Sequence, residues 1–121
     1  MNERIKLPTT RPGITHRFVI DGVKGYITVG LFEDRPMEIF ITLFKEGSTI
    51  AGFADSLARL TSIALQYGVP MEVLCAKMQG HRFEPSGLTN NRNIPEVESI
   101  IDYVFRWLQL TFPKNESDRP N

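Results

Sequence analysis

The stretch Lys45–Gly68, KEGSTIAGFADSLARLTSIALQYG, has a start signal, a sustained period and a stop signal, and it predicts the central helix of the chain. Ser48 or Thr49 is expected to cap its first turn, because a hydroxyl oxygen can accept a hydrogen bond from the free backbone N–H groups there. Gly68 is expected to end it. Apolar side chains at helical spacing predict the face that packs on a sheet: Ile50, Phe53, Leu57, Leu60, Ile63, Ala64 and Tyr67. The opposite face is polar and is expected to meet water or a partner: Asp55, Arg59, Ser62 and Gln66.

The start of this helix has a second possible use. Gly47, Ser48 and Thr49 present unpaired N–H groups at the positive end of the helix dipole, which favours a phosphate or a carboxylate. The alternative is a plain capped helix without a ligand.

Three strands are expected before the helix, at Thr15–Ile20, Tyr26–Glu33 and Met37–Phe44, because apolar residues alternate there. Turn residues at 21–25 and 34–36 predict that neighbouring strands are antiparallel. The third strand carries Phe40 and Phe44 on the face opposite its main apolar row. Since a monomer seldom exposes such aromatics together, we expect another element or another subunit to cover them.

After the helix, Pro70–Met78 predicts a short helix ended by Gly80, and residues 81–93 predict a long ordered loop. A last helix is expected from Pro95 to Thr111, with Asn93 in its cap region. The fold class is therefore α+β: an antiparallel meander of three or more strands, with two longer helices and one short helix on one face. We expect an extended arm at 1–13, a single domain at 14–112 and a disordered tail at 113–121.

Composition narrows the function classes. Fourteen basic and fourteen acidic residues cancel, so nothing favours duplex nucleic acid or a membrane surface as a partner. No apolar run approaches the roughly 20 residues that span a bilayer, and a cytoplasmic location is expected. One cysteine, Cys75, excludes an internal disulfide and a zinc site built from cysteines. No pattern indicates a metal, a cofactor or catalytic residues.

The loop at 81–93 combines groups suited to a nucleotide. Phe83 can stack on a base, and Arg82 and Arg92 can meet phosphate. The residues that can bond a ribose or a base edge are Thr89, Asn90, Asn91 and Asn93. The alternative is that Phe83 fills the core while the asparagines form turns.

Six motifs in order carry a resemblance to a known domain: RPGITHRF, GYITVGLFED, EIFITLFKEGST, ALQYGVP, RFEPSGLT and IDYVFRWL. They resemble the TSCPD domain, the C-terminal module of adenosylcobalamin-dependent (class II) ribonucleotide reductases, over roughly residues 11–112. A chain with a single cysteine cannot by itself perform thiol-dependent ribose reduction. The resemblance implies either a detached accessory domain of such a reductase or a free-standing relative used for binding.

The chain is also similar to the phage Thoeris anti-defence sponges of the first type. That resemblance implies a non-catalytic homo-oligomer, either a dimer or a higher oligomer such as a hexamer, that acts in the host cytoplasm if it is phage-encoded. Such a protein sequesters a cyclic nucleotide signalling molecule, namely cyclic ADP-ribose-like signals and in some members cyclic oligonucleotides. Position by position, it places the stacking aromatic on Phe83, the asparagine on Asn93 or Asn91, and the arginines on Arg59 and Arg106. Arg92 is added from its chemistry alone.

The sponge is the main functional hypothesis from the sequence, because it accounts for a neutral protein with local arginines and a polar, aromatic loop. A detached reductase domain is the first alternative. A purely structural assembly domain is the second.

Overall fold

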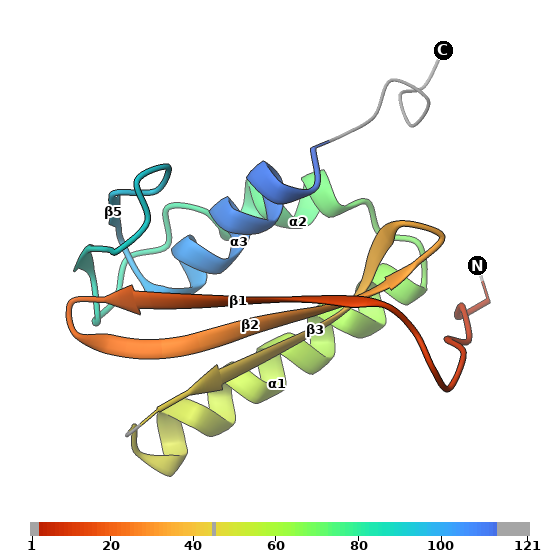
Figure 1. Cartoon of the computed structure of the whole chain (residues 1–121), viewed down its shortest axis with the longest axis horizontal. Helices are drawn as coiled ribbons and strands as arrows, with labels where there is room; N and C mark the ends of the chain where they lie inside the picture. Colours follow the sequence, from red (N-terminus) through yellow and green to blue (C-terminus); the bar gives the residue numbers. More distant parts are fainter. Residues whose placement is uncertain (1–2, 45, 114–121) are drawn as a thin grey trace.

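The structure is a computed structural model that describes residues 3–44 and 46–113. Its main sheet is antiparallel with the order β1-β2-β3, formed by β1 (Gly13–Ile20), β2 (Val23–Phe32) and β3 (Arg35–Leu43). Three helices follow the sheet in sequence, interrupted by a small second sheet: α1 (Ser48–Gln66), α2 (Met71–Met78), β4 (Gly87–Leu88), β5 (Glu96–Val97) and α3 (Ile100–Thr111) (Figure 1). The predicted α+β fold with a three-stranded meander is confirmed.

Both hairpins close with two-residue turns. Asp21 and Gly22 have φ angles of 46° and 81°, and Glu33 and Asp34 have 52° and 62°. Two successive positive φ angles are typical of turns whose twist matches that of antiparallel strands. The second turn therefore begins one residue before the predicted 34–36 segment, and Arg35 already belongs to β3.

The core lies between one face of the sheet and α3. Alternating residues of the strands are buried there: Phe18, Ile20, Ile27, Val29, Ile39 and Ile41. The Phe18 ring meets Tyr103 of α3 at a centroid distance of 5.2 Å. α2 lies beside α3 on the same side of the sheet (Figure 1).

The other face of the sheet carries the two phenylalanines noted in the sequence. Phe40 is 47% exposed and Phe44 is 42% exposed, and Tyr26 meets the Phe44 ring edge-on at 5.4 Å. The residues that the structure describes leave both rings partly open to solvent, so their burial by a second subunit stays a prediction.

The central helix forms as predicted, but its orientation was predicted wrongly. Phe53 is 74% exposed and Leu60 is 65% exposed, and Ile50, Ile63 and Tyr67 are also exposed. The buried face consists of Leu65 and of small or polar residues, four of which recur at intervals of four: Ala54, Ala58, Ser62 and Gln66.

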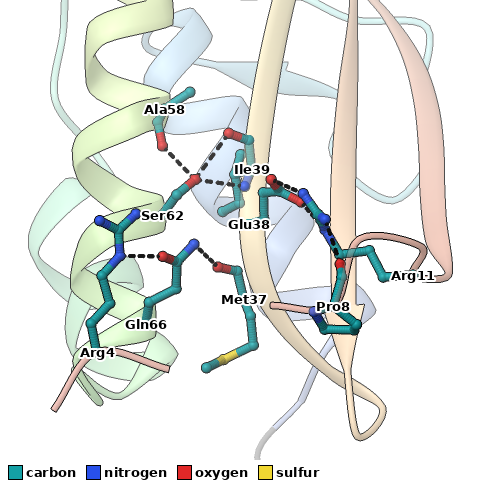
Figure 2. Close-up of polar contacts among 9 residues, drawn as sticks. All are labelled: Arg4, Pro8, Arg11, Met37, Glu38, Ile39, Ala58, Ser62 and Gln66. Atoms are coloured by element: carbon teal, nitrogen blue, oxygen red, sulfur yellow. Dashed lines mark hydrogen bonds and ion pairs between the residues drawn. The ribbon is translucent and has the colours of Figure 1, made fainter. Parts of the chain in front are cut away.

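α1 turns this face inward because it lies along the free edge of β3. Ser62 Oγ accepts a hydrogen bond from the Ile39 N–H at 2.8 Å and lies 3.2 Å from the Ile39 carbonyl oxygen (Figure 2). Gln66 donates to the carbonyl of Met37 at 3.0 Å. Small side chains let the two backbones approach, while polar ones satisfy the edge groups that a strand otherwise leaves unpaired.

The start of α1 also differs from the prediction. Gly47 occupies the N-cap position and no side chain caps the helix, so neither Ser48 nor Thr49 has the predicted capping role. Ser48 is already the first helical residue. At the other end, Gly68 has a φ of 95° and follows the helix as predicted.

The N-terminal arm packs against the domain. The Ile5 N–H donates to the Gln66 carbonyl at 2.8 Å, and Leu31 donates to the carbonyl of Pro12 at 2.9 Å. Arg11 forms a bidentate ion pair with Glu38 (Figure 2). Its Nε lies 2.7 Å from Glu38 Oε2, and its Nη2 donates to Glu38 Oε1. The arm is therefore held by both α1 and the sheet.

The last helix starts later than predicted, at Ile100 instead of Pro95. Ser99 caps it by accepting a hydrogen bond from the Asp102 N–H at 3.0 Å. Glu96 and Val97, predicted to be helical, pair with Gly87 and Leu88 and so give the preceding loop a small sheet. The tail predicted to be disordered was 113–121. Apart from Pro113, it lies outside the described residues.

No helix within residues 3–44 and 46–113 has the length and apolar character needed to cross a membrane.

Candidate functional site

A cleft of about 530 Å³ lies between the edge strand β1, the loop that follows β4, and α3. Its lining includes His16 and Arg17 from β1, the run Asn90–Asn93 from the loop, and Trp107 from α3. The structure thus places four predicted ligand residues together in one cleft: Asn90, Asn91, Arg92 and Asn93.

The loop is fixed to the free edge of β1. Asn90 accepts from the Val19 N–H through its side-chain oxygen at 3.0 Å, and its own N–H donates to the Val19 carbonyl at 3.2 Å. Two residues after Val19, the Asp21 N–H donates to the Leu88 carbonyl at 3.0 Å. This pairing covers the edge of β1 and brings the asparagine run beside His16 and Arg17.

Tyr103 joins the three walls of the cleft. Its hydroxyl lies 2.8 Å from His16 Nε2 and accepts a hydrogen bond from Asn91 Nδ2 at 3.0 Å. The His16 ring also stacks on Trp107, with centroids 4.7 Å apart and planes 12° apart. One buried hydroxyl therefore orients both the histidine and the loop.

Asn91 shapes the turn that presents Arg92. Its Oδ1 accepts from the Asn93 N–H at 2.9 Å, and its own N–H donates to Thr89 Oγ1 at 3.0 Å. Because its amide oxygen and one amide hydrogen are both used inside the protein, Asn91 acts mainly as a positioning residue. Arg92 and Asn93 are exposed.

Burial sets the protonation of the histidine and tyrosine pair. It lowers the pKa of His16 and raises the pKa of Tyr103, the second effect being partly opposed by the hydrogen bond from Asn91. Tyr103 therefore keeps its proton at neutral pH. Its hydroxyl lies within hydrogen-bond distance of His16 Nε2 and can donate to that nitrogen when the neutral histidine carries its proton on Nδ1.

This arrangement predicts a pH dependence of stability. Because the folded-state pKa of His16 lies below its unfolded value of about 6.5, acidification lets the unfolded chain bind a proton that the folded protein resists. The free energy of unfolding should be at its full value above that pH and should fall as the pH drops below it. Urea unfolding between about pH 5 and pH 8 measures this slope.

His16→Gln should flatten the slope, whereas His81→Gln, at an exposed position, should leave it unchanged. An equal slope in wild type and His16→Gln would show that another group controls the acid response.

The cleft is positive. Arg17 and Arg92 both line it, and neither forms an ion pair with any other residue that the structure describes. No carboxylate is among the lining residues. Two arginines with adjacent amides are suited to binding an anion with several oxygens, such as a phosphate group.

The other predicted ligand residues lie outside this cleft. Phe83 is 41% exposed and meets His81 edge-on at 5.5 Å, so it does not fill the core. Arg106 donates to Asp102 at 2.8 Å, and Arg59 donates to Asp55 at 2.9 Å on α1. The structure therefore does not bring Phe83, Arg59 or Arg106 to Asn91.

Gly47, Ser48 and Thr49 are exposed at the start of α1. They too are absent from the lining of the cleft, so a ligand at that helix end would be a separate site.

Five lining residues were not predicted as ligand residues: His16, Arg17, Trp107, Leu110 and Thr111. The alternation of β1 does place His16 on the same face as Phe18, which was a usable signal for its contact with the last helix. Asn90 was predicted from the composition of its loop, but its position in the cleft depends on pairing with Val19, 71 residues away.

Among the described residues, no three His, Cys, Asp or Glu side chains gather closely enough to hold a metal ion.

Comparison with known proteins identifies relatives. The family model of the TSCPD domain matches residues 3–112. The chain is 50% identical over 119 residues to the vitamin B12-dependent ribonucleotide reductase of Rhodopirellula baltica, covering 98% of this chain and 11% of that protein. It is 44% identical over 110 residues to the protein of the same name from Streptantibioticus cattleyicolor, covering 90% of this chain and 18% of that one. No solved structure gives a significant match.

These relatives overturn the main hypothesis from the sequence. A third, from Bradyrhizobium diazoefficiens, is also named as a vitamin B12-dependent ribonucleotide reductase and is 40% identical over 114 residues. The hypothesis of a phage sponge for cyclic ADP-ribose-like signals is wrong, and the reductase alternative is the better supported. The chain spans only 9 to 18% of the length of these three relatives. Because the family model covers nearly all of its residues, the chain belongs to the TSCPD domain family.

Proposed function

We propose that this chain is a non-catalytic module of a vitamin B12-dependent ribonucleotide reductase, and that its cleft binds a ribonucleotide through the phosphates. The observation that carries the first part is the 50% identity across 98% of the chain to the Rhodopirellula baltica reductase. The location proposed with this role is the cytoplasm.

The state of Cys75 supports a non-catalytic role. Its thiol is fully buried, and burial, together with the negative charge of Glu72, raises its pKa to about 11. A thiol with that pKa is protonated at neutral pH, whereas thiol chemistry requires the thiolate. Cys75 is therefore suited to packing against the core and not to ribose reduction.

The positive cleft supports a ribonucleotide as the ligand. Its volume of about 530 Å³ lies within the range of small-molecule sites. Arg17 and Arg92 supply charged donors for phosphate oxygens, and the asparagine amides can bond ribose hydroxyls. A ribonucleotide is also the class of molecule that the relatives' name implies.

The cleft does not fit vitamin B12 itself. A corrinoid is far larger than the drug-sized ligands that sites of this volume enclose. We assign the vitamin B12 chemistry to reductase segments other than these residues.

Ribonucleotide binding should depend on Arg92. Replacing it with alanine removes a charge-assisted hydrogen bond, typically about 1.5–3 kcal/mol, so the dissociation constant should rise about ten- to a hundredfold. Isothermal titration calorimetry with ATP, and with tripolyphosphate to isolate the phosphate contribution, measures the change.

Arg82→Ala is the matched control, because Arg82 is an exposed arginine of the same loop region that pairs with Glu98 at 3.1 Å and does not line the cleft. It should leave the affinity nearly unchanged. Absence of ATP binding by the wild type, or equal losses in the two variants, would contradict a ribonucleotide site in this cleft.

A further inference from the structure

His16 is the cleft residue whose charge can change near neutral pH. It lines the cleft together with Arg17 and Arg92, whose guanidinium groups stay charged at any physiological pH. The phosphate contacts proposed above come from the two arginines, which leaves the histidine ring on the same wall without a role in binding.

The two ring nitrogens of His16 have different surroundings. Nε2 lies 2.8 Å from the Tyr103 hydroxyl. Nδ1 has no hydrogen-bond partner among the described residues, and in that part of the chain no side-chain nitrogen or oxygen is buried without a partner. Nδ1 must therefore reach solvent. Since the ring lines the cleft, this nitrogen is suited to donating to an anion there.

The surroundings of His16 oppose a charged ring while no anion is bound. Arg17 precedes Phe18 on β1 and Arg92 comes from the loop, so the charged residues that share the cleft wall with His16 are positive. From α3 the ring meets the neutral hydroxyl of Tyr103, and its partner on β2 is Ile27. Burial acts in the same direction, because it lowers the pKa of His16.

A bound anion would reverse this balance. Its negative charge offsets the two arginines and attracts a protonated ring directly. An imidazolium donates from both nitrogens, so Nδ1–H can bond the anion while Nε2–H keeps the contact with Tyr103. The hydroxyl has two acceptor positions and can accept from Asn91 at the same time. Trp107 favours the same state, because its face, stacked on the His16 ring at 4.7 Å, attracts a cation.

We propose that His16 is a third cationic group of the phosphate site and that it takes up one proton from solvent as an anion binds. This inference rests on the proposed function, because it assigns a further binding residue to the same cleft. Since binding and protonation are linked, each must strengthen the other, and anions should bind more tightly at acidic pH.

Sulfate is the probe that tests this link. Its two negative charges do not change between about pH 5 and pH 8, whereas a phosphate group titrates near pH 6. In calorimetric titrations at constant ionic strength, the wild type should bind sulfate about tenfold more tightly at about pH 5.5 than at about pH 8.

His16→Gln is the informative variant, because glutamine keeps neutral hydrogen-bonding groups but cannot take up the proton. Its sulfate affinity should change less than about twofold between the two pH values. His81→Gln is the matched control, because His81 is exposed and does not line the cleft. It should keep the pH dependence of the wild type.

Proton NMR gives a second readout that a purely structural histidine would not change. The chain has two histidines, and His81→Gln leaves a single one, which assigns the ring signal of His16. Saturating sulfate should raise the pKa of His16 in this variant.

Equal sulfate affinities at the two pH values, or an unchanged pH dependence in His16→Gln, would overturn the inference. Absence of sulfate binding at both pH values would overturn it as well. ATP binding by the same protein at the higher pH would show, in either case, that the ribonucleotide site itself stands. Absence of both sulfate and ATP binding would remove the proposed site together with this role of His16.

Discussion

Replacing Asp102 with alanine should lower the free energy of unfolding by about 3–5 kcal/mol, because three donors at once lose the acceptor that this fully buried carboxylate provides. Its Oδ1 accepts from the Gly80 N–H at 2.6 Å and from Arg106 Nε at 2.8 Å, and its Oδ2 accepts from the Glu98 N–H at 2.9 Å. These bonds join the end of α2, the segment before α3 and α3 itself. Chemical unfolding at neutral pH measures the loss.

Asp55→Ala is the matched control for this prediction. Asp55 also pairs with an arginine four residues later, at 2.9 Å, but both side chains are exposed. Its loss should cost less than about 1 kcal/mol. Similar losses in the two variants would show that the buried bonds of Asp102 contribute little beyond an ordinary helical ion pair.

Replacing Ser62 with alanine should lower the free energy of unfolding by about 1–3 kcal/mol. The substitution leaves the Ile39 N–H of the β3 edge buried beneath α1 without its 2.8 Å acceptor. It removes almost no apolar surface, so the effect isolates the polar contact between helix and strand edge. The same unfolding measurement applies.

Ser56→Ala is the control, because Ser56 is an exposed serine of the same helix. This change should be neutral or slightly stabilising, since alanine is the better helix former. If Ser62→Ala were equally harmless, the proposed reason for the orientation of α1 would not hold.

The strands and the central helix were predictable because each depends on a local pattern. Alternation places Phe18, Ile27 and Ile39 on one face of the sheet, and that face is the buried one. The turn residues Asp21 and Gly22 likewise closed a hairpin where predicted. Patterns of this kind arise from neighbours in sequence and need no knowledge of distant contacts.

The orientation of α1 was not predictable from its period. A helical period predicts that one face of the helix is apolar. It does not show whether that face or the opposite one packs against the sheet. The strand edge at Ile39 needs small and polar partners, so Ala58 and Ser62 face inward and Leu60 faces outward. A helix that packs on the face of a sheet would instead turn its large apolar residues inward and its small and polar residues outward.

The candidate site was predictable only in part. The run Asn91–Asn93 stood out by composition, and the structure places it in the cleft. Its neighbours His16 and Trp107 come from distant segments and are brought there by backbone pairing with β1. The start of α3 had a usable signal, Ser99 followed by Asp102 three residues later, which Pro95 outweighed by favouring an earlier start.

Turnover of a hybrid enzyme tests the central claim most directly. In the Rhodopirellula baltica reductase, the matching 119-residue segment is replaced by this chain, and vitamin B12-dependent formation of deoxyribonucleotide is measured beside a deletion of that segment. The hybrid, with Cys75 intact or changed to alanine, should retain turnover within about fivefold of the parent, and the deletion should lose it. A folded hybrid no more active than the deletion, or a loss of activity caused by Cys75→Ala alone, would contradict a non-catalytic reductase module.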